Sequence, residues 1–182
     1  MPVKLIPFIY TAVLALILIA TVPKEIIRRL AIYGIIFGAV FDIVLVVVTD
    51  ALGEFGYRNY EPFGLLGIHF LAPIAWAIFF IMYFYFLPER KPLVYVYVTV
   101  AILASIAFCQ TLAKLGVLYL THDILDSIIP FLIWYPAVTW GYYRLTGYFA
   151  ECLTEIEQSR PLMPDLEPAR KQFQWEKKEP VD

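Results

Sequence analysis

The stretch LAIYGIIFGAVFDIVLVVVT, residues 30–49, carries a single charged residue, Asp42. A helix needs roughly 20 apolar residues to cross the hydrocarbon core of a bilayer. The stretch therefore predicts a membrane-spanning helix with a carboxyl group inside it. Gly34 and Gly38 in the same stretch have G-x-x-x-G spacing, which predicts a face that packs closely against another helix.

Four further stretches have the same apolar character, so the chain is predicted to be an all-α, polytopic bundle of transmembrane helices. The five predicted spans are 5–22, 30–49, 63–87, 93–112 and 124–143. Hydrophobic residues make up 61% of the 182 residues, which exceeds the roughly one half found in soluble proteins. We expect a multi-pass protein of the cell membrane, with a five-helix domain at 1–150 and a proline-rich, charged cytoplasmic tail at 151–182.

The basic residues of the connectors fall mainly on one side of this predicted bundle. That side carries Lys24, Arg28, Arg29, Arg90, Lys91 and Arg144, whereas the other carries Lys4, Arg58 and Lys114. Cytoplasmic loops are enriched in Lys and Arg, so we expect the N-terminus outside and the C-terminus in the cytoplasm. Tyrosines near the predicted cytoplasmic ends, among them Tyr83 and Tyr97, are expected at the level of the lipid headgroups.

Two pairs of spans share features that suggest a parallel repeat of spans two–three and four–five. Residues 52–56 are LGEFG and, sixty positions later, residues 112–116 are LAKLG. The following spans contain Pro73 and Pro136, each shortly before a tryptophan. The alternative is that both segments are ordinary helix ends, where glycine readily adopts the left-handed conformation.

Polar residues inside the predicted spans form the first candidate site. Asp42 is expected roughly 10 Å below the outer surface, and His69 and Gln110 are expected at a similar depth. An ionisable residue in a membrane helix costs free energy and is expected to face a partner or water. A cluster of Asp42, His69 and Gln110 would serve a proton or cation step or bind the head of a lipophilic ligand such as a quinone. The alternative is a structural hydrogen-bond network between helices.

The second candidate site is the start of the fifth span, where His122 and Asp126 have i, i+4 spacing. Two such side chains on one helix face can hold a divalent metal. The competing interpretation is helix capping, with Thr121 or Asp123 as the N-cap and the acids favoured by the positive helix end. A further alternative is one haem b held by His69 and His122, but no cofactor is expected from the pattern as a whole.

The chain contains no phosphate-binding, dinucleotide-binding, serine-hydrolase or zinc-protease motif, so a non-catalytic protein is favoured. The absence of a basic stripe argues against a nucleic-acid partner. Residues 63–88, which begin FGLLGI and end FLP, resemble small multi-spanning membrane proteins of bacteria, and this resemblance implies no particular activity.

Two functions remain open from the sequence. The first is an accessory or anchoring subunit of a membrane complex or homo-oligomer. In that case the tail residues Arg170, Lys171, Phe173 and Trp175 are candidate partner contacts. The second is a small carrier, or a protein that binds a lipophilic ligand, quinone or lipid, at Asp42 and His69.

Overall fold

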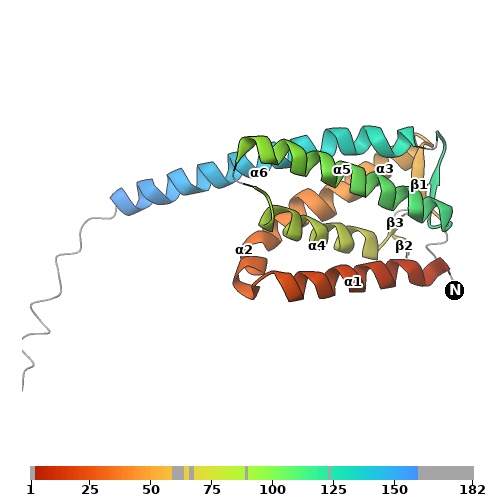
Figure 1. Ribbon diagram of the computed structural model, residues 1–182, viewed down its shortest axis with the longest axis horizontal. Coiled ribbons are helices and arrows are strands. Elements are labelled where there is room, and N and C mark those ends of the chain that lie inside the picture. Colours follow the sequence, from red (N-terminus) through yellow and green to blue (C-terminus); the bar gives the residue numbers. More distant parts are fainter. Residues whose placement is uncertain (1–2, 59–63, 66–67, 89, 123, 160–182) are drawn as a thin grey trace, which may run out of the picture. The chain divides into compact units, whose positions relative to one another are not determined.

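The computed structural model describes residues 3–58, 64–65, 68–88, 90–122 and 124–159, with the backbone alone at 65, 68 and 148–159. The chain divides into two compact units, Met1–Tyr142 and Tyr143–Asp182. Figure 1 shows a mainly helical first unit. Its elements are η1 (Val3–Leu5), α1 (Ile6–Thr21), α2 (Lys24–Gly34), η2 (Ile35–Val40), α3 (Phe41–Ala51), β1 (Phe55–Tyr57), β2 (Gly64–Leu65), β3 (Ile68–His69), α4 (Leu71–Tyr85), α5 (Lys91–Lys114), β4 (Leu118–Leu120) and α6 (Leu125–Ser159), which continues into the second unit.

Three of the five predicted spans are confirmed as helices long and apolar enough to cross a membrane. Within the described residues these helices are Val3–Thr21, Lys24–Ala51 and Lys91–Lys114. The predicted span 63–87 is wrong at its start, because α4 begins only at Leu71. Gly64 and Leu65 pair instead with His69 and Ile68 in a short antiparallel ladder, and the glycine-rich sequence here disfavours helix.

The predicted span 124–143 lies within α6, which has 35 residues and continues through Pro130 and Pro136. The expected domain boundary at residue 150 falls inside the same helix. The boundary between the two compact units lies instead between Tyr142 and Tyr143, and the backbone helix α6 continues through it.

Helix α4 packs tightly against η2, as the G-x-x-x-G spacing predicted. A Cβ atom on Gly38 would lie 2.6 Å from the carbonyl oxygen of Trp76, and one on Gly34 would lie 2.7 Å from that of Ala77. These positions therefore accept only glycine. The segment η2 is a π-helix, which is a wider turn that changes the direction of the side chains after it.

Helices α3 and α5 end in matching glycine caps. The strands that follow the caps, β1 and β4, pair with each other in a two-stranded ribbon. Gly53 and Gly116, 63 positions apart, both have positive φ, 74° and 75°. The next residue along donates back into the helix in each case, Glu54 to Thr49 and Val117 to Leu112, both at 3.0 Å. The sequence comparison placed residues 52–56 opposite 112–116, an offset of sixty positions, and this offset is wrong for the two cap glycines. Strand β1 pairs antiparallel with β4, with Gly56 opposite Tyr119.

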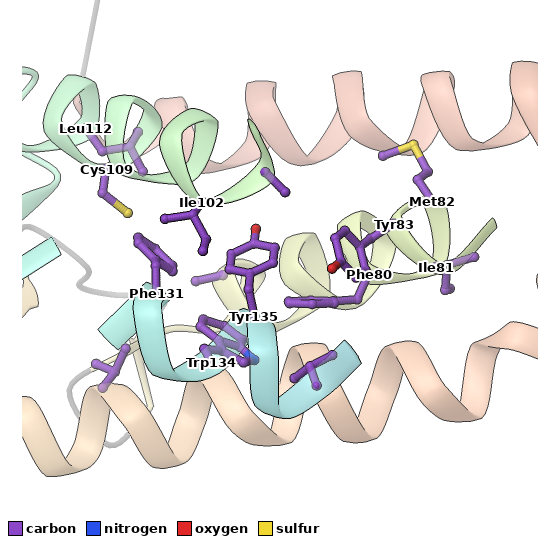
Figure 2. Close-up of a cluster of buried hydrophobic side chains, with 14 of the residues drawn as sticks. Phe80, Ile81, Met82, Tyr83, Ile102, Cys109, Leu112, Phe131, Trp134 and Tyr135 are labelled. Carbon is purple, nitrogen blue, oxygen red and sulfur yellow. The ribbon is translucent and has the colours of Figure 1, made fainter. Parts of the chain in front are cut away.

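The core is aromatic and joins α4 to α6. Figure 2 shows Phe80 and Tyr83 of α4 beside Trp134 and Tyr135 of α6, with Phe80 5.3 Å from Trp134 between ring centroids. Tyr83 is buried and shares a 2.6 Å hydrogen bond with Thr139. The expectation that Tyr83 lies at the lipid headgroups is wrong, because its hydroxyl has a partner inside the bundle.

Candidate ligand cavity

A cavity of about 480 Å³ lies among α1, α3, α4, α5 and α6, with β1 and β4 at one end. Its walls are mainly apolar and aromatic. The aromatic residues that line it are Tyr10, Phe55, Tyr57, Trp76, Phe79, Phe108 and Phe131. The polar residues are Asp42, Ser105 and Cys109, together with the two tyrosines. Large apolar cavities with a few polar groups are typical of small-molecule sites.

The exposed residues that line the cavity lie on α1 and α5, and from this we infer that it opens between these two helices. Of the residues that line it, Ile9 and Val13 on α1 and Ala104 and Phe108 on α5 are exposed. The rings of Tyr10 and Phe108 meet across this opening, with their centroids 5.3 Å apart. Both helices belong to the segments long and apolar enough to cross a membrane. The opening therefore has apolar edges on both sides.

Asp42 is the acid of this cavity and is 2% exposed. Its Oδ2 atom is buried and has no hydrogen-bond partner within the described part of the chain. Asp42 lies two residues after the end of the π-helical segment η2. The Trp134 indole N–H donates to the carbonyl oxygen of Phe37 in that segment, at 2.9 Å. This bond anchors the wide turn that sets the direction of the Asp42 side chain.

Three further polar groups interact with the carboxyl group, and none of them was singled out from the sequence. Tyr10, Tyr57 and Cys109 each interact electrostatically with Asp42. Burial, followed by the effect of Asp42, raises the pKa of the Tyr57 hydroxyl well above its ordinary value. Tyr57 is thus a neutral hydroxyl at physiological pH. Ser105 shares a 2.5 Å hydrogen bond with Tyr135.

The structure gives the three members of the predicted polar cluster separate surroundings. His69 is buried in β3, where its Nδ1 accepts a 3.3 Å hydrogen bond from the Leu71 N–H. Its ring lies against those of Phe8 and Phe70. Gln110 donates to the Ser127 hydroxyl at 3.2 Å and so links α5 to α6. Of the three residues, Asp42 alone lines the cavity.

His122 and Asp126 are brought together, but as a helix start. Asp126 Oδ2 accepts hydrogen bonds from the Thr121 and His122 N–H groups, both at 2.7 Å. His122 Nδ1 lies 3.3 Å from Asp126 Oδ1, and the histidine side chain is 62% exposed. In the described residues, no group of three or more His, Cys, Asp or Glu side chains is placed to hold a metal ion. The contacts favour capping, with Asp126 as the acceptor, and the predicted cap Asp123 lies outside the described residues.

The structure describes the two histidines proposed for haem, but not the candidate partner contacts in the tail. The pair proposed for haem consists of one buried histidine, His69, and one exposed histidine, His122. The tail residues Arg170, Lys171, Phe173 and Trp175 lie outside the described residues. Comparison of the chain with protein families, curated proteins and solved structures gives no match.

Proposed function

We propose that this chain is a multi-pass membrane protein that binds a lipophilic ligand in the cavity beside Asp42. The observation that carries the proposal is the cavity itself, which combines about 480 Å³ of mainly apolar space with one buried carboxyl group. Volumes of about 300–1,000 Å³ accommodate drug-sized ligands. An opening between two apolar helices is the entrance expected for a molecule that arrives through the lipid.

The proposal includes five spans, with the N-terminus outside and the C-terminus in the cytoplasm. Helix α4 has 15 residues and is about 22 Å long, which is short for a span, but it is strongly apolar and seven of its residues are buried. The parallel repeat is part of the same proposal. It is supported by the matching caps at Gly53 and Gly116 and by the β1–β4 pairing.

The alternative function, an accessory subunit of a membrane complex, stays a prediction from the sequence. Its main basis was the tail at 151–182, and residues 160–182 are outside the described part of the chain. No contact within the described part of the chain adds to it.

Native mass spectrometry of the protein purified from its own membrane tests the proposal. We expect a bound lipophilic molecule that co-purifies with wild type. Ala104→Phe should displace it, because Ala104 is an exposed residue at the cavity opening. Ala107→Phe is the matched control, since Ala107 is exposed on the same helix and does not line the cavity. Equal retention in all three proteins, or no bound molecule in wild type, would overturn the proposal.

A further inference from the structure

The charge balance of the cavity indicates what kind of ligand it accepts. Among the described residues that line it, Asp42 is the only acid, and none is Lys, Arg or His. The buried Oδ2 atom has no hydrogen-bond donor among the described residues. Buried charges in proteins are normally paired, because an unpaired one costs several kcal/mol. Such a carboxyl group is either protonated or paired with a positive charge, and no described residue of the cavity supplies that charge.

The aromatic walls of the cavity are a second feature that favours a positively charged ligand. Aromatic rings line it from several elements, among them Tyr10 on α1, Trp76 on α4 and Phe131 on α6. The face of an aromatic ring carries partial negative charge and attracts cations, most strongly where water is excluded. A carboxylate surrounded by aromatic rings is therefore suited to a cation with an apolar body.

We infer that the ligand is a lipophilic cation, an amine or quaternary onium compound, whose charged group pairs with Asp42. Its apolar body occupies the space between α1 and α5 and enters past Tyr10 and Phe108. This inference rests on the proposed function and adds the chemical class of the ligand to it.

A neutral quinone would use the polar groups of the same cavity in a different way from a cation. Quinone oxygens only accept hydrogen bonds, and an ionised carboxylate also only accepts them. A quinone would therefore need a protonated Asp42 or would depend on the Tyr10 and Tyr57 hydroxyls. The Ser105 hydroxyl is already engaged with Tyr135. A cation takes the place of the proton on Asp42 and supplies the positive charge that the described lining lacks.

Binding of radiolabelled tetraphenylphosphonium to the full-length protein in phosphatidylcholine nanodiscs tests the inference. Empty nanodiscs give the background from partition into lipid. We expect saturable binding to wild type that is weakened at least about tenfold in Asp42→Asn, which keeps the shape of the side chain and removes its charge. Thr11→Val is the control, because Thr11 is another buried residue with an unpartnered side-chain oxygen and does not line the cavity.

The pH dependence supplies a second readout. A proton and the cation compete for the same carboxylate, so binding should weaken as the pH falls. The other titratable groups that face Asp42 are the Tyr10 and Tyr57 hydroxyls and the Cys109 thiol. Such groups are neutral at low pH, and so they do not produce this dependence.

The outcomes separate the inference from the proposed function. Equal tetraphenylphosphonium binding in wild type and Asp42→Asn would overturn the role of the carboxylate. Saturable binding of decylubiquinone, blocked by Ala104→Phe, together with no binding of the cation, would overturn the ligand class and leave the cavity as a lipophilic site. If a phospholipid is the only species that the cavity retains, the inference is also wrong.

Discussion

Gly38 has backbone atoms of a neighbouring helix close to it, because an added Cβ atom would lie 2.6 Å from the backbone oxygen of Trp76 and 2.9 Å from Cα of Ala77. Backbone atoms cannot rotate away as a side chain can. We expect Gly38→Ala to lower the free energy of unfolding by about 1–3 kcal/mol, measured by thermal or denaturant unfolding in detergent.

Gly147→Ala is the control for this change. Gly147 lies in a helix with no atom within 4 Å of its added Cβ, and alanine there should stabilise by up to about 1 kcal/mol. If both variants behave alike, the close contact between η2 and α4 is not as described.

His69 should make stability depend on pH. Burial lowers the pKa of its imidazole, so the folded protein keeps the ring neutral at a pH where the unfolded chain, with a histidine pKa of about 6.5, is already protonated. The stability that the neutral His69 ring contributes is therefore fully present above about pH 6.5 and is lost as the pH falls below that value. The melting temperature should fall less between pH 7.5 and 5 in His69→Gln than in wild type. Identical slopes would contradict this assignment.

Asp42 could be singled out from the sequence because one charge in a long apolar stretch is a local signal. The other polar residues of the cavity could not be singled out from the sequence. Tyr10 and Tyr57 are two of 13 tyrosines, and nothing in their spacing distinguishes them. A cavity arises where helices fail to fill the space between them, which depends on packing that no single segment encodes.

At the scale of elements, the start of α6 depends on Asp126 more than on His122. Asp126→Ala removes an acceptor for two backbone N–H groups and should cost about 0.5–2 kcal/mol. His122→Ala removes only an exposed ion pair, worth about 0–1 kcal/mol. Unfolding in detergent measures both.

Zinc and EDTA provide the contrast with a metal site. If Asp126 is a cap, neither should shift the melting temperature of wild type. A clear stabilisation by zinc that is lost in His122→Ala would restore the metal interpretation.

The helices were easier to predict than the strands. Apolar stretches such as 93–112 show their helices directly, since lipid leaves a helix as the main way to satisfy the backbone. Strand β1 pairs with β4 across some sixty residues of sequence, and each strand has only three residues. Such short, distant partners leave no periodic pattern, so the ribbon was missed. The hairpin of β2 and β3 was missed because its apolar residues extended the apparent span of α4.

At the scale of the whole molecule, the number of spans depends on α4 and α6, which are not among the three confirmed spans, and α4 can be tested directly. If α4 crosses the membrane, Arg58 before it and Arg90 after it lie on opposite sides. We expect a cysteine at position 58 to react with a membrane-impermeant maleimide from outside, and one at position 90 only from the cytoplasm. The background is Cys109→Ala with Cys152→Ala.

Labelling of both positions from the same side would mean that α4 does not cross, and the five-span proposal would then be wrong. Position 58 labelled only from the cytoplasm and position 90 only from outside would keep α4 as a span and reverse the orientation.

The ribbon of β1 and β4 also sets the order in which the cavity is completed during synthesis. The chain emerges from its N-terminus, and domains begin to fold as they emerge. Phe55 and Tyr57, which line the cavity, have their strand partners only after about sixty more residues have been made. Under the five-span proposal, helices α1, α3 and α4 enter the bilayer around an unfinished pocket, and a ribosome-bound chain that ends before Leu118 lacks the strand that pairs with β1.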